Sequence, residues 1–332
     1  MNKYSQQQIE RIAHKVIDLM KTEKENWFKP FSSFTYSADK KTFLTNQPFN
    51  AVSGNNYSGY NVIELSLSSL LYSNNAWVTF KQAQQLGGSV LKGEQGHPVC
   101  YYGVARSKED TTTTAGLITE KSYAFLKWYK VFNIDQTTLD AKSIIGDTLL
   151  KNKNQAESNL KKFGERKIKT NAELDLFVQN TSAKIIHAQA GRCFYVPSKD
   201  FINMSPLDTW KGQGEVSAED FYYSVLFHEL THWTGHETRL NRKDSNPYKE
   251  NGYKKSYAFE ELVAELGSAI TASVLGITKT PMANHAQYLS SWVEAIEDKP
   301  AILMKASAQA GQAFTLLASL QQSQSESEEA AA

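Results

Sequence analysis

The sequence predicts an α+β protein in which a small α+β domain is followed by a mainly helical domain with a small sheet. Three observations predict this class. The chain opens with apolar residues at helical spacing, continues through short β-rich runs as far as Asp135, and then returns to helical periodicity. A length of 332 residues with 41% hydrophobic content suits two domains with real cores.

The first domain is expected to cover residues 1–135. Its first helix is predicted from about Ser5 to Lys24, where apolar residues recur at the spacing of one buried helix face: Ile9, Ile12, Ala13, Val16, Ile17 and Met20. Beyond Tyr36, short β-rich runs are separated by turns rich in Gly or Asn. The expected strands are residues 61–67, 90–91, 99–104 and 128–134.

A linker is expected over residues 136–170, which are rich in Lys, Asn, Gln and Ser. Few large apolar side chains occur between residues 151 and 169, so this stretch cannot bury a core of its own. Residues 321–332 consist only of Ser, Gln, Glu and Ala, and we expect this tail to be disordered.

The second domain is expected to cover residues 171–320. A short helix is predicted near residues 172–181, followed by a hairpin whose strands, 184–187 and 193–196, flank a turn at 189–192. Two long helices and a C-terminal helical segment follow. This half is therefore expected to be mainly helical.

Charge and cysteine content limit the possible partners and compartment. The net charge is +1, but residues 1–135 hold 15 Lys and Arg against 11 Asp and Glu, so any nucleic-acid contact must come from a local basic patch in that half. Cys100 and Cys193 are too few for a disulfide framework. No apolar run approaches the roughly 20 residues that span a bilayer, and no signal peptide is evident. We expect a soluble, cytoplasmic protein with no membrane partner.

A metal-binding motif lies in the second half. His228, Glu229 and His232 form H-E-x-x-H, and residues four apart on an α-helix project from the same face, so both imidazoles can bind one ion. The flanking sequence predicts the helix independently: residues 217–220 read as a capping box, no Gly or Pro interrupts residues 221–234, and Gly235 stands where a C-terminal cap belongs. We predict one zinc ion per chain, other divalent metals being possible, with Glu229 as the catalytic base.

A catalytic zinc needs a third protein ligand and an open position for water. Glu261 and Glu265 lie at i and i+4 on a predicted helix over residues 258–275, opposite its apolar face, and no Lys or Arg between Phe259 and Leu275 offsets their charge. An ordinary acidic surface is the alternative reading. His236 is a weaker candidate because it follows the expected helix end, and Thr238 stands where a third histidine ligand of an extended motif would be required.

The E-x-x-x-E spacing resembles the E-x-x-x-D helix of gluzincin peptidases, in which the first acid binds zinc and the second orients a ligand histidine. The resemblance implies that Glu261 is the ligand and that Glu265 supports a histidine, although the two roles could be exchanged. The expected chemistry is peptide hydrolysis, with His236, Tyr253 and Tyr257 as possible stabilisers of the oxyanion. By analogy with other zincins, the strand near residues 193–196 could present its edge to a peptide.

The first half interleaves aromatic residues with amides and lysines, a composition that suits stacking of unpaired bases but is also typical of a core. Its motifs resemble those of plasmid-borne ArdC antirestriction proteins, whose N-terminal domain is shared with TraC-type conjugative primases. The matching segments follow one order along the chain: Y-S-G-Y-N at 57–61, W-V-T-F-K-Q-A at 77–83, G-G-S-V-L-K-G-E at 87–94, V-F-N-I-D-Q at 131–136, Y-V-P-S-K-D-F-I-N-M at 195–204, H-E-L-T-H-W-T-G-H at 228–236 and E-E-L-V-A-E-L-G at 260–267.

This resemblance implies an N-terminal domain that binds single-stranded DNA, joined to a zincin-like metallopeptidase domain, acting while DNA enters a new host by conjugation. The DNA-contacting residues it suggests are Tyr57, Tyr60, Asn61, Trp77, Lys81 and Lys92. A departure from the family pattern is Ser205, where the family tends to have Pro. Too few residues follow Gly276 for a primase domain, so no polymerising activity is expected.

Three functions are compatible with these motifs. The first is a DNA-bound metallopeptidase that protects incoming single strands, with a protein on the same DNA as a possible substrate. The second is a non-proteolytic protein that shields single-stranded DNA and keeps its zincin domain for structure alone. The third is a free cytosolic peptidase whose first half recognises protein substrates.

Overall fold

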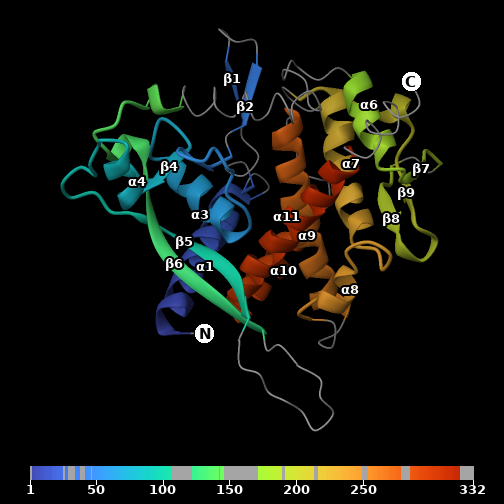
Figure 1. Ribbon diagram of the computed structural model, residues 1–332. Coiled ribbons are helices and arrows are strands. Elements are labelled where there is room, and N and C mark those ends of the chain that lie inside the picture. The colour runs from blue at the N-terminus through green and yellow to red at the C-terminus, as the bar shows by residue number, and fades with distance from the viewer. Residues whose placement is uncertain are drawn as a thin grey trace, which may run out of the picture.

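The fold has the predicted α+β character, with the strands concentrated in the first half and long helices in the second (Figure 1). The computed structural model describes residues 2–24, 27–28, 34–37, 42–45, 47–106, 122–141, 143–145, 171–188, 191–212, 216–248, 253–277 and 285–321. None of the helices in this described part combines the length and apolar character that a bilayer-spanning segment requires.

The first half surrounds a four-stranded sheet of order β3-β4-β6-β5. The strands are β3 (Phe49–Asn50), β4 (Ala76–Thr79), β5 (His97–Arg106) and β6 (Ser122–Asn133), and a separate antiparallel pair is formed by β1 (Phe34–Ser37) and β2 (Thr42–Thr45). The helices are α1 (Lys3–Glu23), α3 (Tyr60–Ser69) and α4 (Phe80–Gln85), and the short 3-10 turn η2 (Ile134–Gln136) ends the sheet region. The two longest strands, β5 and β6, make an extended antiparallel ribbon.

The expected strand at residues 61–67 is wrong, because these residues lie in α3. Ile63, Leu65 and Leu67 alternate as in a strand, but Val62 is buried as well, since α3 packs on more than one side and its apolar residues do not follow a single face. Of the expected strand at residues 90–91, only an isolated bridge from Val90 to Thr137 forms. The other two expected strands correspond to parts of β5 and β6.

The second half is mainly helical, as predicted. Its helices are α6 (Asn171–Asn180), α7 (Ala218–Thr234), α8 (Arg242–Ser245), α9 (Tyr253–Leu275), α10 (His285–Asp298) and α11 (Ala301–Ser319). A small sheet consists of β7 (Lys184–Ile186), β8 (Phe194–Val196) and β9 (Phe201–Asn203), with the short turns η3 (Pro197–Lys199) and η4 (Leu207–Thr209) beside it.

The expected hairpin between residues 184–187 and 193–196 is wrong. The strand order is β7-β9-β8, so β9 lies between the two segments, parallel to β7 and antiparallel to β8. The true hairpin joins β8 to β9 through a turn in which Asp200 has a left-handed φ of 48°. This arrangement leaves β8 at the edge of the sheet, next to α7.

The main core joins the two halves of the chain. Ile12, Val16 and Met20 of α1 belong to the same buried cluster as Phe259 of α9 and Trp292 of α10. Helix α1 therefore packs against the helices of the second half (Figure 1). Part of the expected linker also packs on a core, because Leu139, Ala141, Ile144 and Ile145 lie against a cluster that contains Ala76 and Val78.

Two expectations fall largely outside the described residues. These are the remainder of the linker, residues 146–170, and the tail beyond Gln321. Gln321 itself is anchored, since its side chain donates to the carbonyl oxygen of Phe177 at 3.1 Å.

Candidate metal centre

Helix α7 carries the H-E-x-x-H motif, and local signals fix its ends. The Ser217 hydroxyl accepts a hydrogen bond from the backbone N–H of Asp220 at 3.0 Å, and Gly235 ends the helix. The negative charges of Glu219 and Asp220 in the first turn interact favourably with the positive end of the helix dipole and so stabilise α7. The helix begins and ends where the sequence predicts, and it holds His228 and His232 one turn apart.

Helix α9 approaches α7 closely at Gly267. A Cβ added to Gly267 would lie 2.6 Å from Cγ2 of Thr231, so only a glycine allows the two helix backbones to come this near. Two turns before Gly267, α9 presents Glu261 to the histidines of α7. The small residue and the carboxylate together explain how two long helices form one site.

Three side chains converge on one point. Nε2 of His228 and Nε2 of His232 are 3.2 Å apart, and each lies 3.4 Å from a carboxylate oxygen of Glu261. Ligands at the usual zinc distance of about 2.0–2.2 Å in a tetrahedron are separated by roughly 3.3–3.6 Å. Among the described residues, these three form a group that fits a metal ion, with all ligand atoms within 4.8 Å of one another.

A carboxylate stands behind each imidazole. Nδ1 of His228 lies 3.5 Å from Glu265, and Nδ1 of His232 lies 3.2 Å from Glu260. Such contacts fix the ring orientation and keep Nε2 directed at the shared point. Glu265 is therefore positioned behind a histidine, whereas Glu261 faces the point where the three ligand atoms meet.

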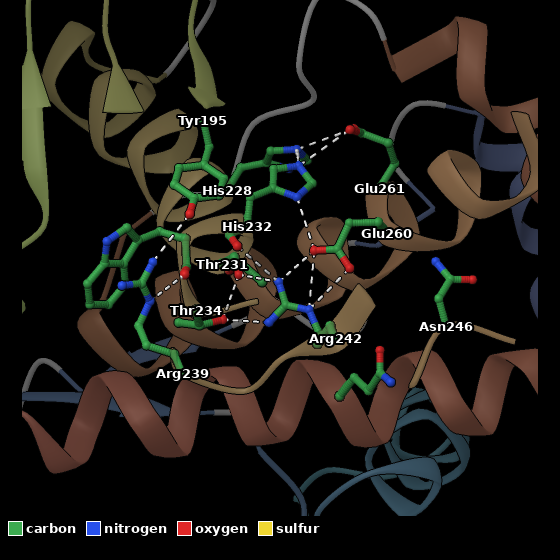
Figure 2. A network of polar contacts seen from close by, with 12 residues as sticks. Tyr195, His228, Thr231, His232, Thr234, Arg239, Arg242, Asn246, Glu260 and Glu261 are labelled. Atoms are coloured by element: carbon green, nitrogen blue, oxygen red, sulfur yellow. Dashed lines mark hydrogen bonds and ion pairs between the residues drawn. The ribbon is translucent and has the colours of Figure 1, made fainter. Parts of the chain in front are cut away.

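Glu260 is held by a buried arginine. Arg242 donates to both carboxylate oxygens of Glu260, from Nε at 3.1 Å and from its terminal nitrogen at 2.6 Å. The same guanidinium donates to the Thr234 hydroxyl at 2.6 Å and to the carbonyl oxygen of Thr231, so it also ties down the last turn of α7 (Figure 2). Arg242 thus fastens Glu260, and through it His232.

The histidines and carboxylates of this site stabilise one another in their charged forms. Burial alone would lower the pKa of His232, but the carboxylates of Glu261 and Glu260 raise it to about 10. Burial likewise opposes a positive charge on His228, yet Glu261 and Glu265 raise its pKa above the ordinary value. The pKa of Glu261 is lowered by the two histidines despite its burial. In the absence of a metal, the site is therefore a network of ion pairs.

A cavity of about 390 Å³ opens over these residues. Strand β8 lines one side through Phe194 and Tyr195, and Tyr257, Tyr288 and Trp292 line another. The Glu229 carboxylate faces the cavity, burial raises its pKa, and it accepts a hydrogen bond from the backbone N–H of Tyr195. The Tyr195 side chain is fixed in turn, because its hydroxyl accepts a hydrogen bond from Arg239 (Figure 2) and donates one to Asp200, which is itself paired with Arg239.

The alternative site residues occupy different surroundings. His236 follows the end of α7, where its Nδ1 contacts the Thr238 hydroxyl at 2.8 Å, and it belongs neither to the described metal group nor to the cavity lining. Tyr257 lines the cavity beside Glu261 and its hydroxyl lies 3.4 Å from that of Tyr288. Tyr253 begins α9, and its side chain lies outside the described residues.

Of the six residues expected to contact DNA, two are buried, two are half-buried and two are exposed. Trp77 is 0% exposed in the core, and Tyr60 is buried with its hydroxyl donating to the carbonyl oxygen of Gln8. The Asn61 amide bonds both the N–H and the carbonyl oxygen of Cys100, so it anchors α3 to the edge of β5. A base could reach the side chains of Trp77 and Tyr60 only if the core opened, whereas Asn61 is half-buried.

The other three DNA candidates remain accessible. Tyr57 is half-buried beside the cluster of Leu65 and Trp77, and Lys81 and Lys92 are exposed. Exposed aromatic side chains in this half lie on α1 and α4, at Tyr4 and Phe80, and on β5 and β6, where sequence reasoning did not place DNA contacts. Side chains alternate between the two faces of a strand, so the exposed aromatic residues of β5 and β6 could have been identified only if the buried face of the ribbon had been known.

Two protein-family models match the chain. Residues 6–132 match the N-terminal domain of anti-restriction factor ArdC, and residues 172–309 match a zincin-like metallopeptidase. Among solved structures, the metal-free crystal structure of a plasmid-encoded antirestriction protein, ArdC, has a TM-score of 0.69 and 30% identity, covering 95% of this chain and 98% of that one. The Mn(II)-bound structure of ArdC has a TM-score of 0.68 and 28% identity, covering 97% and 98%.

Longer relatives share the same unit. Two proteins of Escherichia coli, each named DNA primase TraC, are 30% identical over 321 and 308 residues, which is 95% and 91% of this chain. The chain spans only 20% and 26% of their length. An uncharacterized protein of Sinorhizobium fredii is 28% identical over 271 residues, covering 78% of this chain and 77% of that one.

Proposed function

This chain belongs to the ArdC family of antirestriction proteins, and we propose that it binds single-stranded DNA entering a cell by conjugation and carries a zinc peptidase site. Membership rests on the ArdC-type N-terminal domain, the zincin-like domain and the 30% identity to ArdC over nearly the whole of both chains. In this proposal residues 1–135 bind DNA, residues 136–170 link the halves, and residues 171–320 form the peptidase domain.

The observation that carries the peptidase proposal is the convergence of His228, His232 and Glu261 under Glu229. Two imidazoles and one carboxylate are a donor set of catalytic rather than structural zinc sites, which leave a position open for water. The separations of 3.2 Å and 3.4 Å between the ligand atoms fit one small divalent ion. The Mn(II)-bound structure of ArdC supports a divalent metal in this family, and the donor set favours zinc.

A bound zinc ion would polarise a substrate carbonyl and lower the pKa of a water molecule to about 7. The chain itself supplies the proton transfers. Burial raises the pKa of the Glu229 carboxyl, which brings it nearer to the range in which one group can both accept and donate a proton. Glu229 is therefore the group that takes a proton from the attacking water and gives it to the leaving amine.

The cavity walls suggest how a substrate is held. Strand β8 is an edge strand that borders the cavity through Phe194 and Tyr195, so an extended peptide can add to it as a further strand. Asp200 and Arg239 stabilise that edge by holding the Tyr195 hydroxyl. Across the cavity, Tyr257 is the residue we propose as oxyanion stabiliser, because its side chain lines the cavity beside Glu261.

A second function, shielding of single-stranded DNA without proteolysis, is favoured by the longer relatives. The TraC proteins are named as DNA primases and contain a segment similar to 95% of this chain. The names of the TraC proteins thus refer to DNA, whereas the name of none of the relatives refers to a peptidase substrate. Under this alternative the metal would stabilise the fold only.

The Glu229→Gln variant separates the two functions. This change removes the base but keeps the shape of the site, so we expect zinc binding and DNA binding to persist while peptide cleavage falls by about 10²–10⁴-fold. Plasmid transfer into a restricting recipient is then compared for the wild type, Glu229→Gln and Lys81→Ala/Lys92→Ala. Loss of protection with Glu229→Gln supports the peptidase, and full protection supports shielding alone.

A further inference from the structure

One face of the β5–β6 ribbon is covered, and the other is open toward the outer end of the ribbon. Trp128 of β6 donates from its indole nitrogen to the Ser5 hydroxyl at 2.7 Å and packs edge-on against Tyr60, so α1 and α3 cover its face. Residues of the opposite parity point the other way. Near β4 that face is covered as well, since Val99 and Val131 are 0% exposed and lie in a cluster with Leu65 of α3. Toward the outer end of the ribbon it opens, and there Tyr129 is 38% exposed, Tyr101 57% and Phe125 42%.

The strand register brings these side chains together. Tyr101 lies directly opposite Lys127, and Phe125 and Tyr129 flank Lys127 two residues away on the same strand. Phe125, Lys127 and Tyr129 therefore share a face, and the ring centroids of Tyr101 and Phe125 are 6.1 Å apart. We call Tyr101, Phe125, Lys127 and Tyr129 the aromatic face.

A glycine allows the rings to lie close to the backbone. A Cβ added to Gly103, the register partner of Phe125, would be 2.5 Å from the Phe125 ring and 2.8 Å from the Tyr101 ring. Both rings therefore lean over Gly103 and occupy the space that a side chain would fill. Tyr101 and Phe125 therefore form one paired aromatic surface, and Tyr129 lies on the same strand face beyond Lys127.

The charge of the ribbon suits a polyanion. Residues 95–106 and 122–134 contain no Asp or Glu, and of their basic residues Lys127 lies on the aromatic face, whereas Arg106 and Lys130 have the opposite parity. A protein partner with an apolar patch would require no such bias, whereas a nucleic-acid strand offers both bases for stacking and phosphates for the lysine. The rise of about 6.8 Å over two residues of a strand is about twice the 3.4 Å spacing of stacked nucleotides, which suits a strand with its bases spread apart.

We propose that the aromatic face is the surface on which bases of single-stranded DNA stack, with Tyr101, Phe125 and Tyr129 contacting bases and Lys127 contacting phosphate. The proposal rests on the proposed DNA-binding function and names its contact residues. It places the main stacking contacts on the ribbon instead of on Tyr60 and Trp77, which are buried.

The test uses the full chain and a labelled oligothymidylate of about 16 nucleotides, near the upper site size of one small single-strand-binding fold. Fluorescence anisotropy measures the dissociation constant for the wild type and for Tyr101→Ala, Phe125→Ala and Tyr129→Ala. We expect each change to weaken binding by between about 5-fold and 150-fold, the range for loss of one base–aromatic stack. Tyr101→Phe and Tyr129→Phe keep the ring and should bind like the wild type.

Two controls separate stacking from charge and from misfolding. Phe80→Ala removes an aromatic side chain of similar exposure, 52%, on α4 outside the aromatic face, and its affinity should equal that of the wild type. The wild type should bind an oligomer with abasic sites more weakly than it binds the oligothymidylate. The alanine variants of the aromatic face should bind that abasic oligomer as well as the wild type does. Lys127→Ala should reduce the slope of affinity against salt concentration by about 1.

The outcomes distinguish the two levels of the proposal. If the wild type binds the oligothymidylate and the three alanine variants bind it equally well, the aromatic face is not the DNA surface, and a protein partner becomes its occupant, while the proposed function stands. The stacking proposal would also be overturned if the three alanine variants lost as much affinity for the abasic oligomer as they lost for the oligothymidylate. Failure of the wild type to bind single strands at any salt concentration overturns both.

Discussion

Gly267 of α9 and Thr231 of α7 are in such close contact that any side chain on Gly267 would collide with the threonine, at 2.6 Å from its Cγ2. The contact sets the separation of the two helices that carry His228 and Glu261. Because the ligand atoms must meet within a few tenths of an ångström, the metal centre depends on a residue that does not touch it.

Enlarging Gly267 is expected to weaken metal binding. Gly267→Ala should destabilise the fold by about 1–3 kcal/mol, since it overpacks a tight helix crossing, and should lower zinc affinity by moving Glu261 away from the histidines. Thermal unfolding and calorimetric zinc titration measure the two effects. Gly311→Ala in α11 is the matched control, because nothing lies within 4 Å of its added Cβ. That change should be neutral or stabilising by up to about 1 kcal/mol, as for Gly in a helix interior. Unchanged zinc affinity in Gly267→Ala would contradict this role.

Glu260 is expected to support metal binding without being a ligand. Glu260→Gln should reduce zinc affinity by about 10- to 100-fold, the usual effect of losing a carboxylate behind a ligand histidine. Glu294→Gln removes an exposed carboxylate from α10 and should leave the affinity unchanged. Competition with a zinc-binding dye gives both values. Equal affinities for the two variants would show that the contact of Glu260 with His232 has no such function.

The Arg242 and Glu260 pair should be strongly coupled. Arg242→Met leaves the Glu260 carboxylate without its main partner and removes a donor from Thr234 and the carbonyl of Thr231. We expect a loss of about 3 kcal/mol in the free energy of unfolding. Adding Glu260→Gln should recover part of that loss, because the uncompensated charge is removed. Urea unfolding of the four proteins in the cycle measures the coupling, and additive effects would argue against it.

The metal-free protein should have a distinctive pH dependence. The pKa of His232 is raised from 6.5 to about 10, so the stability it contributes is complete below pH 6.5 and is lost as the pH rises toward 10. The pKa of Glu261 is lowered from 4.5, so its contribution is present above pH 4.5 and is lost in acid. Stability in the presence of a chelator should therefore be greatest between about pH 4.5 and 6.5.

Zinc should reverse the alkaline part of this profile. Metal binding requires neutral imidazoles, so zinc affinity should rise with pH as protons are released. Melting temperatures from pH 5 to 9, with chelator and with zinc, measure both trends. A melting temperature that rises from pH 6.5 to 9 in chelator would be inconsistent with the ion-pair network around His232.

The sequence predicted α7 well because its signals are local. Ser217 and Gly235 mark the ends of the helix through contacts within a few residues, and the spacing of His228 and His232 fixes their common face. Arg242 carried no such signal. It lies on a four-residue helix after an irregular turn, and only the folded chain brings it to Glu260.

The sequence failed where burial on several sides hides periodicity. Helix α3 has apolar residues around most of its circumference, so the alternation of Ile63 and Leu65 resembled a strand. The order of the small sheet could not be predicted, since β9 pairs with both neighbours and strand order is a non-local property. Aromatic residues presented the same difficulty. Trp77 and Tyr101 are both aromatic residues in β-rich runs, but Trp77 is in the core and Tyr101 is exposed.

The inclusion of α1 in the core of the second half has a mechanical consequence. Ile12 and Met20 pack with Phe259 and Trp292, near the wall of the cavity, while Trp128 of the ribbon rests on the same helix through Ser5. A nucleic-acid strand bound on the ribbon and a polypeptide bound at β8 would thus stay at a fixed distance from each other, because both surfaces rest on the same core. Selection of a target would then depend on where it sits along the bound strand, and a fragment lacking residues 3–23 would lose that alignment together with part of its interior.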